Sequence, residues 1–167
     1  MRSEDEDEYR RYVDGRLDAL CRFGFLLCGD WHLAEDVVAT ALTKLYVAWP
    51  RVARRDEVDA YVRRIVVHCL ADERRHVRWR RERTTYQAPE RPVADHAQES
   101  ADRLTAQRAL AKLPARQRAA IVLRYWEDQS VEQTAALLNC STGTVKSQCA
   151  RGLSTLRELL AHSEGAH

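Results

Sequence analysis

Cysteine and histidine side chains are the groups in this chain best suited to metal binding or nucleophilic chemistry. Cys140 and Cys149 stand nine positions apart in the stretch NCSTGTVKSQCARGL, residues 139–153. A zinc ribbon or a redox motif spaces its cysteines as CxxC, and no such pair occurs among the five cysteines at positions 21, 28, 69, 140 and 149. His68 and Cys69 are adjacent, but neighbours on a helix point about 100° apart. We therefore predict no metal site and no cofactor.

The helical register offers a second interpretation of the two cysteines. Cys149 falls on one helical face with Val145 and Leu153, and Cys140 falls in the turn before that helix. Buried cysteine commonly acts as a small apolar side chain, which favours packing over redox or metal chemistry. The chain also lacks a glycine-rich phosphate loop and a nucleophile elbow, so we expect a protein that is not an enzyme.

Charge is distributed unevenly along the 167 residues, although the formal net charge is only +2. Residues 4–8 form an acidic run, whereas RRHVRWRRER at 74–83 carries six arginines and one glutamate. A clustered basic stripe indicates contact with a polyanion, and the alternative is a solvated helix end. The acidic start and the lack of an 18-residue apolar run predict a soluble, cytoplasmic protein without membrane insertion.

The apolar periodicity predicts an all-α fold in two domains. Three amphipathic helices, at about 8–28, 31–48 and 56–82, should form an N-terminal three-helix-type bundle over 1–83, with Gly29 and Pro50 limiting the first two. Residues 84–100 contain two prolines and no apolar period, which is typical of a flexible linker. Four further helices, at about 101–112, 115–126, 130–138 and 142–160, should form a C-terminal domain over 101–167, with Pro114 at N1 of the second.

The last two of these helices fit a helix-turn-helix. Ser130 and Gln133 form a capping box, Ala135 is small at the helix crossing, and Asn139 suits a left-handed turn position. Ser141 can cap the second helix, whose apolar anchor is Val145. The opposite face of the second helix carries groups that hydrogen-bond to base edges and phosphates: Thr144, Ser147, Gln148 and Arg151. Lys146 can add a phosphate contact. DNA binding is favoured over a plain helical hairpin.

Three stretches in the same order resemble the sigma-70-type transcription initiation factors. Residues 113–159, LPARQRAAIVLRYWEDQSVEQTAALLNCSTGTVKSQCARGLSTLREL, resemble region 4. GDWHLAEDVVATALTKLYVAW at 29–49 and YVRRIVVHCLADERRHVRWRRER at 61–83 resemble region 2. With no equivalent of region 3, the pattern is similar to the extracytoplasmic-function (ECF) group, the minimal two-domain sigma factors.

The resemblance implies that the protein recruits core RNA polymerase to promoter DNA and helps to open it. The second helix would dock on the β′ coiled coil, the β flap of the polymerase would also be contacted, and an anti-sigma factor would restrain the protein. The docking residues implied are Glu35, Asp36, Val37, Leu42 and Leu45. An acidic pair beside apolar residues is a reasonable protein-binding edge, although acids near a helix start are also favoured by the helix dipole alone.

The resemblance also assigns the two promoter elements. The helix-turn-helix would read the −35 element. The loop before the third helix would hold a flipped base of the −10 element, and the arginine-rich helix end would follow the strand. The residues implied for the −10 region are Arg55, Asp56, Arg63, Arg64, Arg74, Arg75, Arg78 and Trp79.

Several positions depart from the family pattern. Family members often have the pair Gln-Glu or Gln-Asp just after the docking acids, where this chain has Ala39 and Thr40. Gln148 stands where the recognition helix of the family often has an arginine. The loss of this arginine should change which bases of the −35 element are preferred and weaken the attraction of the helix for DNA phosphates. Two alternatives remain: a helix-turn-helix regulator with an N-terminal sensor or dimerisation bundle, and an interaction module that sequesters polymerase or a sigma factor.

Overall fold

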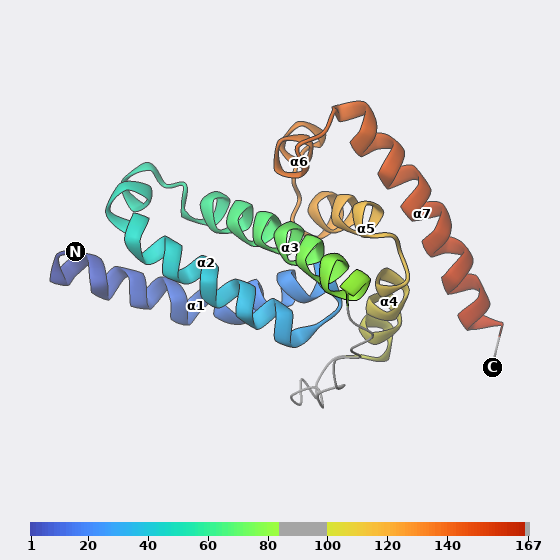
Figure 1. The fold of residues 1–167 in the computed structure, drawn as a ribbon, viewed down its shortest axis with the longest axis horizontal. Coiled ribbons are helices and arrows are strands. Elements are labelled where there is room, and N and C mark those ends of the chain that lie inside the picture. The colour runs from blue at the N-terminus through green and yellow to red at the C-terminus, as the bar shows by residue number, and fades with distance from the viewer. Residues whose placement is uncertain (84–99, 166–167) are drawn as a thin grey trace. The chain divides into compact units, whose positions relative to one another are not determined.

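The computed structural model describes residues 1–83 and 100–165, with side chains described for 1–72 and 100–165. Every regular element in these ranges is a helix, so the predicted all-α fold is confirmed (Figure 1). The chain divides into two compact units, Met1–Phe25 with Asp30–Arg91 and Leu26–Gly29 with Pro92–His167. Of the predicted linker at 84–100, residues 84–99 lie outside the described ranges, and Ser100 caps the helix that follows. No helix among the described residues is long and apolar enough to cross a bilayer.

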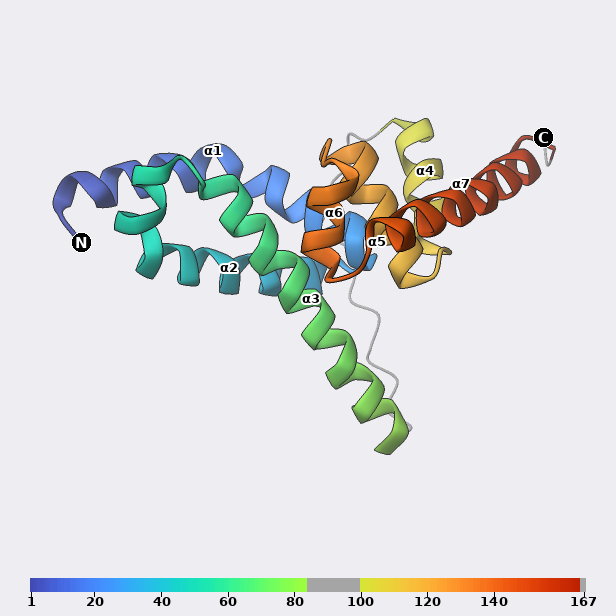
Figure 2. The same cartoon turned by 90° about the horizontal axis from the view of Figure 1, so that it is seen from above.

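Three long helices build the first unit. They are α1 (Ser3–Cys28), α2 (Trp31–Val52) and α3 (Val58–Arg83), with a 3-10 turn at Ala53–Arg55 between the last two. The last three residues of α1 belong to the second unit. Successive helices run back and forth (Figures 1 and 2). Apolar residues at helical spacing face the interior, and the largest fully buried side chains of this unit are Val38, Leu45, Val62 and Val66. Gly24 allows close contact between α1 and α2, since a Cβ there would lie 3.1 Å from that of Ala34.

The helix ends of this unit differ from the predicted ones in three places. α1 begins at Ser3, because the acidic side chains of its first turn are favoured by the helix dipole. Pro50 does not end α2, which continues to Val52. Proline near a helix end costs only one internal hydrogen bond, and the burial of Trp49 and Val52 stabilises the added turn. Asp56 does not start α3: it has φ 54°, a left-handed conformation, and α3 begins two residues later.

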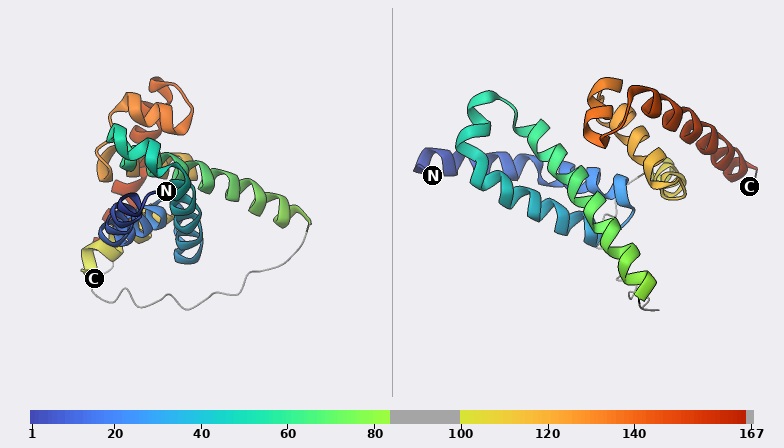
Figure 3. Two further views of the ribbon diagram at one scale, coloured as in Figure 1. Left: turned by 90° about the vertical axis from the view of Figure 1, so that its left-hand side faces the viewer. Right: turned by 45° about the horizontal axis from the view of Figure 1, so that its top comes forward.

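Four helices build the second unit: α4 (Ala101–Ala111), α5 (Ala115–Ile121), α6 (Val131–Leu138) and α7 (Thr142–Glu164). The predicted helix at 115–126 is α5 followed by a π-helical turn at Val122–Trp126. Pro114 is the N-cap of α5 and not its first residue, because its ψ of 146° is extended. α7 crosses α6 after a short turn, as the right-hand view of Figure 3 shows.

The buried side chain of Arg118 joins α4 to α5. Its guanidinium donates hydrogen bonds to the carbonyl oxygens of Leu110, Ala111 and Leu113. Carbonyls at the end of a helix lack partners within the helix, so a charged donor stabilises this buried turn. The contact positions α5, and α5 in turn packs against α7.

Candidate nucleic-acid interface

The turn between α6 and α7 is held by local hydrogen bonds. The Ser130 hydroxyl accepts from the backbone N–H of Gln133 at 3.0 Å, and the Gln133 side chain accepts from the N–H of Ser130 at 2.9 Å. This confirms the predicted capping box. Asn139 ends α6 with φ 53°, as predicted, and the Ser141 hydroxyl accepts from the N–H of Thr144 at 3.1 Å. α6 therefore spans the predicted residues after its cap at Ser130, and α7 begins where predicted but ends at Glu164, four residues beyond the predicted end.

A small apolar cluster fixes the angle between these two helices. It consists of Ala120, Ala135, Val145 and Cys149, with Val131, Leu138 and Cys140 packed against it. Cys149 is buried, and burial raises the pKa of its thiol, while the charge of Arg124 lowers it to a smaller extent. A thiol with a raised pKa stays protonated and unreactive at neutral pH. Both cysteines therefore occupy packing positions in the hairpin.

The outer face of α7 presents most of the predicted reader side chains to solvent. Lys146, Ser147 and Arg151 are exposed, and Gln148 is half-buried at the edge of this face. Thr144 is also half-buried, and its hydroxyl lies 2.9 Å from that of Ser141, so it belongs partly to the N-cap. Lys146, Ser147, Gln148 and Arg151 offer hydroxyl, amide and cationic groups from one helix, the set that proteins use on major-groove edges and phosphates.

A basic pocket of about 280 Å³ lies in the first unit, where α2 ends and α3 begins. Two guanidinium groups flank one aromatic ring: the carbon of Arg51 lies 5.9 Å and that of Arg64 5.6 Å from the centroid of Tyr61. The residues that line the pocket are Arg51, Val52, Arg55, Glu57, Ala60, Tyr61 and Arg64. Its volume is close to the lower end of the ~300–1,000 Å³ typical of small-molecule sites, which suits one flat ring.

The pocket contains only some of the residues predicted for the −10 region. Arg55 and Arg64 line it, and Asp56 lies in the adjoining turn, whereas half-buried Arg63 is outside the lining. The pocket is also lined by Arg51, Glu57 and Tyr61, which were not predicted for the −10 region although they lie in or beside the turn before α3. The remaining predicted positions lie on α3 where side chains are outside the described residues: Arg74, Arg75, Arg78 and Trp79.

The predicted docking set on α2 divides by burial. Glu35 and Asp36 are exposed, but Val37, Leu42 and Leu45 are 4%, 8% and 0% exposed. The prediction that these three apolar side chains face a partner is corrected, because they pack inside the bundle. The exposed stripe next to the two acids carries Ala39, Thr40, Thr43 and Val47.

Hydrogen bonding within α2 gives this stripe a partly apolar character. The hydroxyls of Thr40 and Thr43 donate to the backbone carbonyls of Asp36 and Ala39 at 3.0 and 2.9 Å. Because both hydroxyls are used inside the helix, less of their polarity is available to a partner. An acidic pair followed by a weakly polar stripe is a surface suited to a basic protein partner.

The described residues show no feature of a metal centre: no group of three or more His, Cys, Asp or Glu side chains in them could hold an ion. The five cysteines are free thiols.

Comparison with known proteins gives consistent similarities over both units. Residues 9–81 match the family model described as sigma-70 region 2, and residues 103–156 match sigma-70, region 4. The chain is 40% identical over 153 residues to the RNA polymerase sigma-E factor of Streptomyces coelicolor, covering 92% of this chain and 86% of that protein. It is 38% identical over 132 residues to the ECF RNA polymerase sigma factor SigM of Mycobacterium tuberculosis, covering 77% and 65%.

A solved structure shares the fold. The sigma factor RpoE from Bartonella quintana, crystallised in complex with the anti-sigma factor NepR, superposes with a TM-score of 0.71 and 25% identity. The match covers 92% of this chain and 97% of that one.

Proposed function

The chain belongs to the sigma-70 family of RNA polymerase sigma factors, in the ECF group with regions 2 and 4, and on that premise we propose how its two units read a promoter. The observation that carries the proposal is the basic pocket with an aromatic wall at the start of α3. A reader of duplex DNA needs only a groove-binding helix. A pocket sized for one ring serves a protein that also takes a base out of the stack.

In region 2, the pocket would hold one unpaired base of the −10 element. The base would stack against Tyr61, while Arg51 and Arg64 contact its face or the flanking phosphates. Extracting a base costs a few kcal/mol, and stacking on an aromatic side chain returns ~1–3 kcal/mol. Since these magnitudes nearly balance, opening would succeed only on favourable sequences.

In region 4, α7 would enter the major groove of the −35 element. Ser147 and Gln148 would contact base edges, and Lys146 and Arg151 would contact phosphates or guanine. The N-terminal end of α7, at Ser141 and Thr144, would face the backbone, where the positive end of the helix dipole attracts phosphate. Reading duplex DNA here and single-stranded DNA in region 2 requires two domains, and the boundaries proposed for them are 1–83 and 101–167, joined by 84–100.

The protein would act with partners and carry out no catalysis of its own. Glu35 and Asp36 would pair with basic residues of the β′ coiled coil of core RNA polymerase, and region 4 would contact the β flap. The structural neighbour in complex with an anti-sigma factor supports restraint of this chain by a similar partner. Such an assembly would work in the cytoplasm, where the polymerase and the chromosome are.

Run-off transcription with purified core polymerase and a genomic promoter library tests the proposal. Specific start sites that depend on this protein are expected. A helix-turn-helix regulator would instead bind a palindromic duplex without core enzyme, and a sequestering module would only inhibit. Absence of any specific transcript would refute the proposal.

Two pairs of variants assign the elements. Arg151→Ala should reduce use of −35-dependent promoters, whereas Arg157→Ala should not. Arg157 is exposed on the same helix, six positions further on and rotated by about 120° from Arg151. Tyr61→Leu should reduce opening of the −10 element about tenfold, whereas Tyr125→Leu should not. Tyr125 is a matched control because it is also packed against an arginine, Arg124, at 5.9 Å.

A further inference from the structure

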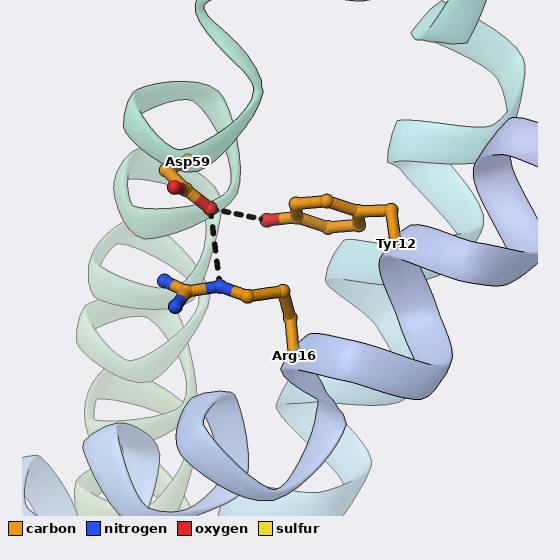
Figure 4. Close-up of polar contacts among 3 residues, drawn as sticks. All are labelled: Tyr12, Arg16 and Asp59. Atoms are coloured by element: carbon orange, nitrogen blue, oxygen red, sulfur yellow. Dashed lines mark hydrogen bonds and ion pairs between the residues drawn. The ribbon is translucent and has the colours of Figure 1, made fainter.

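Tyr12 on α1 contacts both helices that form the walls of the basic pocket. Its hydroxyl donates a hydrogen bond of 2.7 Å to Oδ1 of Asp59, in the first turn of α3 (Figure 4). Its ring lies 5.7 Å, centroid to centroid, from that of Trp49 on α2. Tyr12 therefore contacts the end of α2 through its ring and the start of α3 through its hydroxyl.

These contacts lie next to the pocket on α3, where Asp59 adjoins the lining residue Ala60, and two residues from it on α2. Asp59 precedes Tyr61 by two positions on α3, and Trp49 precedes Arg51 by two positions on α2. Trp49 is buried, and a second tyrosine, Tyr9, packs edge-on against its ring at 5.5 Å. Because helix backbone is stiff over two residues, a displacement of Asp59 relative to Trp49 moves the two pocket walls relative to each other.

Arg16 adds an ion pair at the same carboxylate. Its Nε lies 3.3 Å from Oδ1 of Asp59, in the view of Figure 4, without hydrogen-bond alignment. The two side chains are about half exposed, so solvent screens the attraction, and the shorter hydrogen bond from Tyr12 is the stronger contact. Asp59 also lies in the first turn of α3, where a negative charge is favoured by the helix dipole.

We propose that Tyr12 and Asp59 are positioning residues that set the separation of Tyr61 from Arg51 and thereby the affinity of the pocket for an unpaired base. Neither needs to touch DNA. The role in opening rests on the proposed function of the pocket, whereas the positioning of Tyr61 does not. α1, a helix without a predicted DNA contact, would thus tune −10 recognition.

The first measurement is independent of DNA. Biosynthetic labelling of the full-length protein with 3-fluorotyrosine gives ¹⁹F resonances for its six tyrosines, and Tyr61→Phe assigns the one in the pocket. Tyr12→Phe keeps the ring and removes only the hydroxyl. It should shift or broaden the Tyr61 resonance. Asp59→Asn, which keeps an oxygen acceptor for Tyr12, should leave that resonance closer to its original position.

Tyr46→Phe is the matched control. The Tyr46 hydroxyl donates to Oε1 of Glu6 at 3.0 Å, so this variant also breaks a tyrosine–carboxylate bond between α1 and α2. Tyr46 does not line the pocket, and its bond does not reach α3. Its removal should leave the Tyr61 resonance unchanged. An unchanged resonance in Tyr12→Phe, or equal shifts in Tyr12→Phe and Tyr46→Phe, would overturn the positioning role.

The second measurement follows promoter opening by holoenzyme, using 2-aminopurine placed in the −10 element of a promoter identified by run-off transcription. Tyr12→Phe should reduce the opening equilibrium about three- to tenfold, the range expected for one partly exposed charge-assisted hydrogen bond, with core binding unchanged. Equal opening by Tyr12→Phe and wild type would refute the effect on affinity. If Tyr61→Leu itself opens DNA normally, the proposed function of the pocket fails, while the ¹⁹F result still decides the positioning.

Discussion

Gly152 on α7 allows the recognition helix to approach α5, and Gly152→Ala should separate the two helices. A Cβ built at this position would lie 2.4 Å from Cδ1 and 3.3 Å from Cγ1 of Ile121, and 3.4 Å from Cβ of Gln117. Ile121 is 4% exposed, so its side chain cannot swing into solvent to relieve the contact. Either Ile121 adopts a poor rotamer or α7 moves away from α5.

Two effects of opposite sign decide how much Gly152→Ala changes the free energy of unfolding. Alanine is favoured over glycine in a helix interior by ~1 kcal/mol, whereas an added methyl group in a packed core costs ~1–3 kcal/mol. The free energy of unfolding of the second unit should therefore fall by about 1 kcal/mol. Gly143→Ala, in the first turn of the same helix, is the matched control because its nearest neighbour, the Ser141 hydroxyl, would be 3.8 Å away.

Hydrogen exchange of α5 and α7 peptides in the full-length protein measures this local stability. Gly152→Ala should speed exchange in both helices, and Gly143→Ala should not. Ile121→Val removes Cδ1 and costs ~0.5–1.5 kcal/mol alone, but it should partly restore Gly152→Ala, with a coupling of about 1 kcal/mol. The reasoning would be wrong if Gly152→Ala protected the amides as well as Gly143→Ala, or if the two substitutions simply added.

Three further outcomes follow from the structure. Gln148→Arg should change the preferred −35 bases and steepen the salt dependence of promoter binding by about one unit of the log–log slope, and a −35 mutational scan with no change in preference would contradict it. Asn139 has φ 53°, a conformation that glycine adopts freely and alanine does not. Asn139→Gly should therefore preserve or slightly raise the free energy of unfolding of the second unit, whereas Asn139→Ala should lower it by ~1 kcal/mol. Equal melting temperatures of the two variants would contradict this. Burial, and then the bond to Asp59, raise the pKa of Tyr12 above its ordinary value of 10.0. Since the pKa of Tyr12 is higher in the folded than in the unfolded protein, its contribution to stability is full below about pH 10 and is lost as the pH rises further. Tyr12→Phe should therefore make the free energy of unfolding fall less steeply at alkaline pH. An unaltered pH dependence would contradict the raised pKa of Tyr12.

Local signals in the sequence determined the helix-turn-helix in detail. The capping box at Ser130 and Gln133, the left-handed Asn139 and the cap at Ser141 each depend on hydrogen bonds within about four residues. Interactions of this range can be read without a fold, because both partners are always close along the chain. The apolar period likewise determined the all-α class and the inward position of Val145 and Cys149.

Helix ends were less predictable where local rules compete. Pro50 commonly ends a helix, yet the packing of Trp49 and Val52 in the bundle core stabilises a further turn of α2. The acids at the chain start lack any apolar period, and the helix dipole extends α1 over them. In each case packing or the helix dipole stabilises the longer helix by about 1 kcal/mol, which outweighs the tendency of the local sequence to end it.

Contacts between helices were decided by the tertiary structure alone. The pocket joins Arg51 and Tyr61 from two helices, Val37 and Leu45 turned inward away from the predicted docking surface, and Tyr12 meets Asp59 across 47 positions of sequence. A periodic pattern shows which side of a helix is apolar, but it does not show which residues of other helices cover that side. The sequence by itself therefore determined what kinds of helices form and which face of α7 can read DNA. Packing decided which side chains share a site, because those distances depend on how separate helices cross.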